Sequence, residues 1–324
     1  MRSEYNANRD GGLRNRFRER IRLRVAARYE ISDYVTVAAR FVTGDPDDPN
    51  STHQTLGTTF NKVSLTLDQA YVNLRLKEQP LWIRAGKFRH PFRTSAVYKE
   101  LVWDADVHPE GVSAGYSFGG PKTHLGAVAA YYLLAERNDA TDASSVAGQV
   151  YLDVSNRSYS IAGALGGYRY SRIKDDNVLF RDNAGNAGVA QFASNFAIVD
   201  AFVNVVYKLS TWSPTVSAQF VKNVDAEVDD DTGVALGASL SRTKGRRSVK
   251  LYYQYQVIEQ DAVFSPFSQD DFLAQTNFNG HVLGLRYGLS RKISINLWGL
   301  VSKRKSPSGG NHQTRLRADL DVSL

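Results

Sequence analysis

Residues 14–29 read RNRFRERIRLRVAARY, a stretch in which arginines and apolar side chains alternate with a period of two. Arginine occupies most even positions, and most odd positions between them are apolar. A helix would scatter both sets around its circumference, whereas a β-strand sends them to opposite faces. Guanidinium groups are rarely buried without partners, so the arginine face must meet water. This stretch therefore predicts a strand with one aqueous and one apolar face.

The composition excludes several kinds of site and of membrane segment. The 324 residues contain no Cys, which rules out disulfides, iron–sulfur clusters, CxxCH haem attachment and cysteine-based zinc sites. No apolar run approaches the roughly 18 residues that a membrane-spanning helix needs. The first residues lack the apolar core of a signal peptide. We therefore expect either a cytosolic chain or a mature or truncated fragment, and the strand pattern favours the fragment.

The basic charge indicates an anionic partner without naming it. A formal net charge of +7 suits nucleic acid, an anionic membrane surface or anionic solutes. Nucleic-acid binders gather Lys and Arg in loops or on helices with interleaved aromatics. Here the densest cations lie on one face of an alternating strand, so we expect no nucleic-acid partner.

The alternation recurs to the C-terminus in 15 candidate strands, most of which we expect to be about 9–14 residues long, about what a tilted strand needs to cross a bilayer. The segments are 14–29, 35–41, 63–76, 81–85, 112–118, 124–133, 146–154, 159–165, 199–205, 216–220, 234–240, 249–257, 283–289, 293–301 and 316–324. In 63–76 the phase slips near Gln69-Ala70, as at a β-bulge.

The connections between these segments alternate in length, which is typical of outer-membrane barrels. The short ones are Glu30–Asp33, Lys77–Pro80, Gly119–Lys122, Ser155-Asn156, Ser210–Ser213, Thr243–Arg246 and Leu289–Lys292. The long ones are 43–62, 89–110, 135–145, 172–195, 223–231, 259–277 and 305–311.

The direction of the strands completes the predicted fold. The last strand and the arginine strand both run from the long-loop side to the short-turn side, so a further strand must precede residues 8–12. Only Met1–Ala7 remains for it, with Glu4-Tyr5-Asn6 as a stub. We predict an all-β chain, a single-domain transmembrane antiparallel β-barrel over residues 1–324. It would have 16 strands, the first truncated in this chain or continuing upstream.

Several motifs in the first part of the chain carry a resemblance to a known family. They are Arg14–Arg28, Thr43-Gly44-Asp45 with Thr52–Gly57, Leu67–Val72, Gly86–Phe92 and Trp103–Val112. In this order they resemble the bacterial putative porin family, and Gly86–Phe92 is also similar to phosphate-selective porins. The resemblance implies an outer-membrane porin, a channel for passive diffusion of small hydrophilic solutes, and a homotrimer. Many outer-membrane barrels end in Phe or Trp, whereas this chain ends in Leu324.

The inward face predicts a cationic pore lining. We expect it to comprise Arg14, Arg16, Arg18, Arg20, Arg22, Arg24, Arg28, Arg40, Arg84, Lys250, Arg286, Arg315 and Arg317. In one interpretation these cations form a row that attracts anions; in the other they pair with inward acids and fix the shape of the barrel. The inward acids are Asp68, Asp153, Asp200, Asp319 and Asp321. Because they are fewer, we expect a mild anion preference.

Other candidate sites are weaker. Asp104, Asp106, His108 and Glu110 alternate as metal ligands would, but a folded loop hydrogen-bonded to the barrel wall is the favoured interpretation. Asp45–Asn50 lacks the spacing of an EF-hand. The run Asp229–Asp231 suits a solvated loop tip, or divalent bridging to lipopolysaccharide. No HExxH, Walker or GxGxxG motif occurs, so we expect no cofactor, no metal and no enzymatic activity.

Aromatic residues beside the short turns predict an interfacial girdle, namely Tyr29, Tyr34, Trp82, Tyr207 and Trp212. We expect Trp298 to pack against a lumenal loop, and either 89–110 or 43–62 to constrict the channel. The leading alternative is a barrel that acts as a scaffold or sleeve for a periplasmic or surface partner. A barrel enzyme and a soluble β-sandwich are further alternatives.

Overall fold

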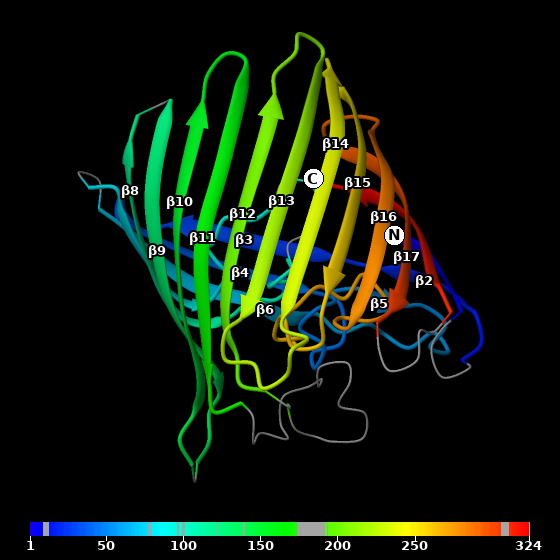
Figure 1. Cartoon of the computed structure of the whole chain (residues 1–324), viewed down its shortest axis with the longest axis horizontal. Coiled ribbons are helices and arrows are strands. Elements are labelled where there is room, and N and C mark those ends of the chain that lie inside the picture. Colours follow the sequence, from blue (N-terminus) through cyan, green and yellow to red (C-terminus); the bar gives the residue numbers. More distant parts are fainter. Residues whose placement is uncertain are drawn as a thin grey trace.

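The fold is a single antiparallel β-sheet that wraps around a central space (Figure 1). The computed structural model describes residues 1–324 except 9–12, 77–78, 96, 99–100, 121, 139, 174–191, 193, 306–310 and 324. Within this part of the chain, no helix is long and apolar enough to cross a membrane. The predicted all-β barrel class is confirmed.

The sheet contains 18 strands. They are β1 (Arg2–Ala7), β2 (Arg16–Ile21), β3 (Arg24–Glu30), β4 (Val35–Val42), β5 (Gln54–Thr55), β6 (Thr66–Arg75), β7 (Leu81–Lys87), β8 (Glu110–Gly119), β9 (Thr123–Ala135), β10 (Ala143–Ser155), β11 (Tyr159–Ser171), β12 (Ala197–Tyr207), β13 (Trp212–Asn223), β14 (Thr232–Lys244), β15 (Arg247–Ile258), β16 (Phe278–Gly288), β17 (Ile293–Arg304) and β18 (Gln313–Val322).

The sheet closes through its first strand. β1 pairs with β18 on one side and with β2 on the other, so Tyr5 lies opposite both Leu316 and Phe17. The stub expected at Glu4-Tyr5-Asn6 is therefore part of the strand that joins the two ends of the chain. Closure matters because an open sheet edge would leave backbone hydrogen-bonding groups unpaired in hydrocarbon.

The 18 strands differ from the 16 expected in two places. The arginine stretch is split into β2 and β3 around Leu23, whose backbone N–H donates to Thr43 Oγ1 (3.0 Å) and whose C=O accepts from Thr43 N–H (3.1 Å). The second difference is β5, a two-residue strand in the connection between β4 and β6 that pairs with the end of β2. The two-residue hydropathy pattern predicts neither the split at Leu23 nor the short strand β5.

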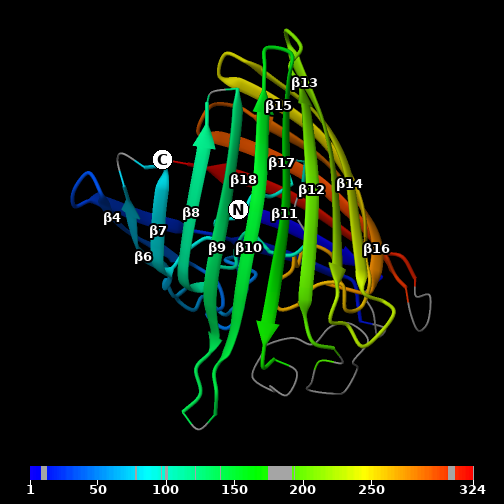
Figure 2. The same ribbon diagram turned by 60° about the vertical axis from the view of Figure 1, so that its left-hand side comes forward.

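Side chains alternate between the two faces of the sheet as the sequence pattern predicts. On β15 the outward Leu251 and Tyr253 are 48% and 41% exposed, whereas the inward Tyr252 and Gln254 between and beside them are buried. The pairing of β4 with β6 skips Asp68, so a bulge lies just before the predicted Gln69-Ala70. Figure 2 shows the resulting curved wall of β8–β14.

The predicted aromatic girdle requires one correction. Tyr29, Tyr34 and Tyr207 are exposed beside short turns, as expected. Trp82 is not in the girdle: its neighbours Ile83 and Ala85 face outward, so its ring lies inside the barrel. There it packs over Gly115, where an added Cβ would lie 2.4 Å from the indole. Proximity to a turn predicted the position of Trp82 but not its face.

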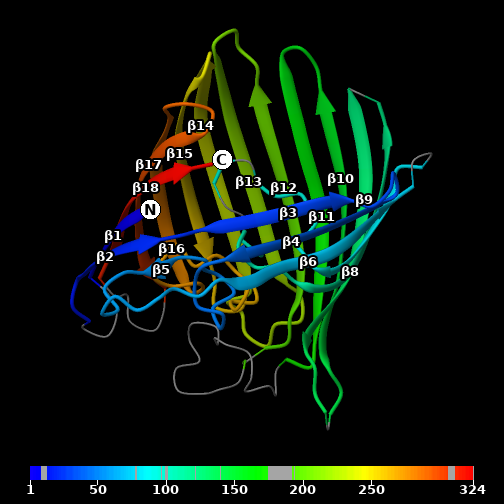
Figure 3. The same cartoon turned by 180° about the vertical axis from the view of Figure 1, so that it is seen from behind.

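The two chain ends and the strands β1–β4 lie on the far side of the barrel from β9–β14, which are at the front of Figure 1. Figure 3 shows β3, β4 and β6 crossing obliquely in front of β10–β13, with both chain ends beside β1 and β18. β3 and β4 have 7 and 8 residues, whereas β9, β10 and β11 have 13 each. The arginine stretch therefore lies on the side of the barrel that has the shorter strands.

Removing the carboxylate of Glu4 should weaken closure of the barrel. Glu4 is fully buried on β1 and pairs with Arg18 of β2 (2.5 Å) and Arg317 of β18 (2.5 Å). In Glu4→Gln the buried Arg317 and the half-buried Arg18 lose their common counter-charge, which costs about 3–5 kcal/mol. We expect a lower temperature for the transition from folded to unfolded mobility on a gel.

The matched control is Glu30→Gln, which removes a carboxylate of an exposed pair with Arg28 at 3.2 Å. Exposed pairs contribute little, so its transition should coincide with that of the wild type. Equal transitions for Glu4→Gln and the wild type would show that the buried pairs do not stabilise closure.

Candidate functional site: the lumen

Two long connections fold into the barrel and pack against its inner wall. They are 88–109, between β7 and β8, and 259–277, between β15 and β16. Trp103 of the first stacks on Phe267 of the second with ring centroids 5.3 Å apart, and it meets Tyr132 of β9 edge-on at 5.9 Å. Phe264 is fully buried against Tyr170 of β11. An aromatic core thus holds both connections inside the lumen.

The inner wall is shaped to receive the first of these connections. An added Cβ on Gly237 of β14 would lie 2.9 Å from Cβ of Val97, and one on Gly233 would lie 3.5 Å from Leu101. Lys250 of β15 donates to Val97 C=O (2.9 Å). Small residues on β14 therefore let the backbone of 88–109 approach the wall closely.

The third inward contact comes from the connection 43–65, between β4 and β6. Asn50 Nδ2 donates to Ser268 C=O (2.7 Å), and Arg20 of β2 donates to Ser51 Oγ (3.1 Å). Of the two segments expected to form a constriction, 89–110 carries the buried aromatic side chains Phe92 and Trp103. The other segment, 43–62, is hydrogen-bonded to the 259–277 connection through Asn50.

A polar pocket of about 260 Å³ lies between these loops and the wall that carries the arginine stretch. It is lined by Arg2, Arg20, Arg22, Arg24, Asn50, Ser51, His53, Tyr98, Ala105, Asp106, Tyr252, Asp270, Asp271, Asn296, Trp298, Arg317 and Asp319. Charged groups of both signs and three aromatic rings thus face one small space.

Buried ion pairs surround this pocket on the β1–β18 side. Arg317 donates to Glu4 Oε2 (2.5 Å) and also pairs with Asp271. Arg315 donates to Asn6 Oδ1 (2.9 Å) and to Asp271 C=O (2.5 Å). These two predicted pore-lining arginines are therefore bound to the first strand and to the second inward loop.

Trp298 lies in the lumen against an inward loop, as the sequence predicts. Its indole N–H donates to Asp319 Oδ2 (2.9 Å), and its ring meets Tyr98 of the 88–109 connection at 5.9 Å. Asp319 also accepts from Arg2 at 2.6 and 3.2 Å. Arg2 was not among the predicted lining residues, since it precedes the alternating stretch.

The middle of the arginine stretch meets the 43–65 connection. Arg20 donates to His53 C=O (2.9 Å) as well as to Ser51, and Arg22 lies 3.7 Å from Asp321. Burial, together with the surrounding guanidinium groups of Arg2 and Arg20, strongly lowers the pKa of His53. His53 is therefore a neutral imidazole within a cationic part of the lumen.

The loop at 104–110 is bonded to the wall, as its favoured interpretation predicts. Arg24 pairs with Asp106 and donates to Thr52 Oγ1 (3.1 Å). Arg40 donates to Asp68 (2.6 Å), which also hydrogen-bonds His108 (3.0 Å). Burial lowers the pKa of His108 despite that carboxylate. Within the described residues, no group of three or more metal-ligating side chains is gathered at one point.

The remaining predicted lining residues are dispersed. Arg84 lies 5.0 Å from the Tyr71 ring, and Arg286 donates to Ser294 (3.1 Å) and lies 3.8 Å from Asp321. The other members follow in order along the stretch: Arg14 precedes β2, Arg16 and Arg18 lie on β2, and Arg28 lies near the end of β3. Their role in lining a pore stays a prediction.

The contacts favour the pairing interpretation of the arginine row for most of its members. Several of their partners were not foreseen, because Glu4, Asp106 and Asp271 lie outside the assigned alternating strands or in loops. Their acidic side chains were visible in the sequence. Their convergence depends on how the loops fold inward, which two-residue periodicity does not specify.

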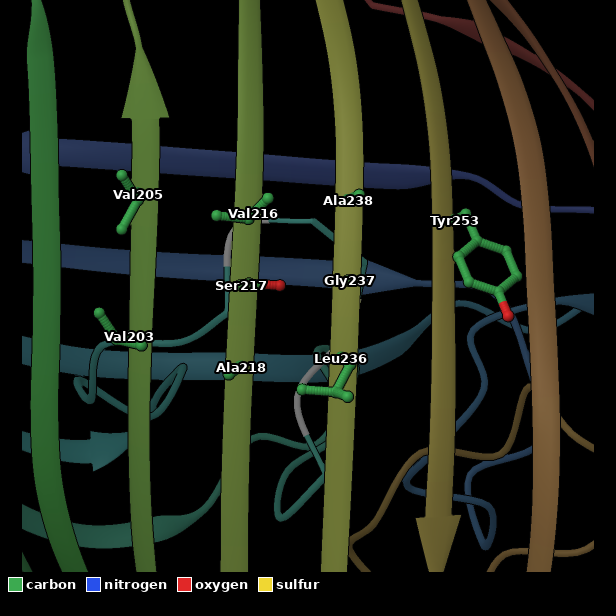
Figure 4. A pocket seen from close by; sticks show the side chains of 9 residues that line it. All are labelled: Val203, Val205, Val216, Ser217, Ala218, Leu236, Gly237, Ala238 and Tyr253. Carbon is green, nitrogen blue, oxygen red and sulfur yellow. The ribbon is translucent and has the colours of Figure 1, made fainter.

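The outer wall carries a shallow apolar groove of about 420 Å³ across β12–β15. Figure 4 shows its lining, in which Val203, Val216 and Leu236 project from neighbouring strands and Tyr253 stands at one side. Aliphatic side chains on this face agree with contact to hydrocarbon rather than to solutes.

A family model described as "Putative porin" matches residues 3–174, more than half of the chain. The chain belongs to this porin family. The resemblance inferred from the motifs is thus confirmed, and the protein is located in the bacterial outer membrane. Family and fold point to a channel for solute diffusion rather than to an enzyme.

Solved structures agree on the fold. OprB of Pseudomonas putida has a TM-score of 0.64 at 11% identity, covering 100% of this chain and 92% of its own. OmpF of Salmonella typhi gives 0.56 at 10% (98% and 94% covered), and the outer membrane channel DcaP of Acinetobacter baumannii gives 0.52 at 14% (98% and 94%). No curated protein sequence matches the chain. At these identities the structural likeness concerns the porin's fold alone.

Enlarging Gly237 should loosen the inward loop. In Gly237→Val the new Cβ would lie within 3 Å of both Val97 and Ser217, so the 88–109 connection must move away from β14. If this connection narrows the lumen, single-channel conductance should rise and the loop should become more sensitive to protease.

Gly120→Ala is the control, because nothing lies within 4 Å of a Cβ added at that turn residue. Its conductance should equal that of the wild type. An unchanged conductance in a Gly237→Val protein with protease-sensitive 88–109 would remove this loop as the constriction.

Acidification should destabilise the porin through His53. Its pKa is lowered in the folded state, so between that value and the ordinary histidine pKa of about 6.5 the unfolded chain binds more protons. This contribution is absent above pH 6.5 and destabilises by up to about 1.4 kcal/mol per pH unit below it. Urea unfolding in vesicles at pH 7 and pH 5 should show a smaller loss in His53→Gln than in the wild type.

His312→Gln removes an exposed histidine and should retain the full acid-induced loss. If His53→Gln also retained it, His53 would not be held neutral by its surroundings.

Proposed function

We propose that this porin forms a water-filled channel for passive diffusion of small hydrophilic solutes, with a mild preference for anions. The observation that carries the proposal is the polar pocket of about 260 Å³, which lies beside the aromatic core and is lined by four arginines of the β1–β3 wall. Charged and polar side chains keep such a space hydrated, while the inward loops limit its width.

The anion preference rests on the charge of this wall. The whole chain contains 40 Lys and Arg residues and 33 Asp and Glu residues. Among the described residues, the carboxylate paired with Arg22 is the distant Asp321 at 3.7 Å, and Arg28 is 63% exposed near the short-turn side, in an exposed pair with Glu30. A narrow passage with low-dielectric walls concentrates counter-ions, so a small excess of cations is enough to bias the current.

The proposed surroundings of the protein are outer-membrane lipid and lipopolysaccharide, with anionic or neutral hydrophilic solutes in the lumen. A homotrimer is the proposed assembly. The short strands of the β3–β4 wall support an interface there, because strands of 7 and 8 residues are shorter than the about 9–11 residues that a bilayer requires.

A second candidate function is a closed barrel that acts as a scaffold or sleeve for a periplasmic or surface partner. The observation that favours it is the aromatic core of the two inward loops, which fills part of the lumen. Conductance separates the two functions, since a closed barrel carries no current.

The deciding experiment is single-channel recording in a planar bilayer under a KCl gradient. We expect discrete steps and a reversal potential on the chloride side. Arg22→Gln should move the reversal potential towards potassium, because it removes a lumenal charge without leaving a hydrogen-bonded carboxylate unpaired. Arg246→Gln, in the turn between β14 and β15, removes the same charge outside the lumen and should leave the potential unchanged.

Steps without chloride selectivity would retain the channel and overturn the anion preference. Folded barrels that give no steps would overturn the diffusion channel in favour of the scaffold.

A further inference from the structure

The polar pocket contains cations and an acid that are near one another but not in contact. Arg20 and Arg22 line one part of it, and Asp270 of the 259–277 connection lines another. The other lining acids are already bound to cations: Asp106 to Arg24, Asp271 to Arg317 and Asp319 to Arg2. Arg20, Arg22 and Asp270 are therefore the three charged side chains of the pocket that are not held in close salt bridges by other described residues.

Arg20 is bonded only to neutral acceptors. It is 8% exposed, and its Nη2 donates to Ser51 Oγ (3.1 Å) and His53 C=O (2.9 Å). Its Nε is buried without an acceptor, and none of the described carboxylates lies at ion-pair distance from the guanidinium. A buried cation of this kind is stabilised strongly by an added carboxylate, since charge-assisted bidentate bonds are the strongest that Arg makes.

Arg22 adds a second cation with spare donor capacity. Its only ion pair among the described residues is with Asp321 at 3.7 Å, well beyond the about 2.7–2.9 Å of a charge-assisted hydrogen bond. His53 is neutral beside it, so the imidazole does not add to the positive charge. Both guanidinium groups line the same pocket, so both are available to an anionic group that enters it.

Asp270 supplies the opposite charge within reach of Arg20. The backbone C=O of Asp270 accepts from Arg315 (3.0 Å), but within the described part of the chain its carboxylate has no ion pair. The carboxylate lies near the guanidinium groups of Arg20, Arg315 and Arg317, and at ion-pair distance from none of them. Opposite charges held apart in one pocket leave room for a ligand that carries both.

We propose that this pocket binds small zwitterionic solutes of the α-amino acid type during their passage, which rests on the proposed channel function. The carboxylate of the solute lies on Arg20 and Arg22, and its ammonium group lies on Asp270. The rings of Tyr98, Tyr252 and Trp298 line the same space and meet the aliphatic part of the solute.

The charge pattern disfavours simpler ligands. A solute with only a carboxylate satisfies the arginines but lies close to the carboxylate of Asp270, and like charges repel strongly where water is scarce. A neutral solute leaves both partners unpaired. A zwitterion compensates both charges at once, so it should bind best.

The test is block of the KCl current through single channels by three probes of similar size. These are L-alanine, the uncharged lactamide, and propionate added at constant ionic strength. We expect alanine to reduce the conductance saturably, propionate to act at least several-fold more weakly, and lactamide to have no effect.

Two substitutions locate the site. Asp270→Asn should weaken the alanine block by roughly tenfold, as loss of a charged hydrogen-bond partner does, and should strengthen the propionate block. Arg20→Gln should weaken block by both solutes. Arg20→Lys keeps the charge where Arg20→Gln fails to fold, and it should still weaken the alanine block because it loses the bidentate donors.

Asp225→Asn is the matched control, since it removes an exposed carboxylate in the connection between β13 and β14. Its alanine block should equal that of the wild type. Gel mobility with and without heating establishes that each variant is folded.

The outcomes separate this inference from the channel itself. Normal channels that alanine and lactamide affect equally would overturn the zwitterion site and leave the channel standing. Propionate block equal to or stronger than alanine block would make the pocket an anion site and would overturn it as well. Folded protein without channels would overturn the channel and, with it, any solute site in its lumen.

Discussion

Backbone hydrogen bonding is the constraint on which the whole structure depends. A strand that faces hydrocarbon has no water to satisfy its N–H and C=O groups, so every strand must have two neighbours or lie at a covered edge. In this porin the ring is completed by the six residues of β1, which pair with β18 and β2. The buried Glu4 lies in this strand and binds arginines from both neighbours. Closure of the barrel and organisation of the lumenal charges are therefore coupled at one residue.

The inward loops determine what the closed ring encloses. A wide barrel would leave a lumen of water, but aromatic side chains of 88–109 and 259–277 form a core against β9–β16. Tyr252 and Trp298 belong both to this core and to the lining of the polar pocket, which also includes arginines of the β1–β3 wall. One side of the lumen is thus built as a protein interior, and the other is built from charged groups. We propose that solutes are selected on the charged side, which packs against the aromatic side.

The sequence was most informative where a two-residue period exists. It predicted the barrel, the face of almost every strand and the bulge beside Asp68, because alternating polarity reports directly on which side of a sheet a residue lies. It was wrong for Trp82, since closeness to a turn carries no information about the face. It also missed the split of the arginine stretch at Leu23, which depends on Thr43 from a distant loop.

The site was less predictable than the fold for a physical reason. The inward arginines were named correctly as cations on one face, but their partners Asp106, Asp271 and Ser51 come from loops that have no periodicity. Whether a guanidinium group is paired or available depends on these loops. Arg20 and Arg24 are only four residues apart on the same face, yet one meets neutral acceptors and the other meets a carboxylate.

The pairing of β1 with β18 also sets an order of events during folding. Arg2 and Asp319 are separated by 317 residues in the chain and lie side by side in the barrel. Contacts of such long sequence separation form late and slowly, because the chain entropy lost on closing the loop must be overcome first. Until β1 and β18 meet, each of them carries an unpaired edge that can bind another chain. The protein is therefore most vulnerable to aggregation immediately before closure, when nearly all of its hairpins are already formed.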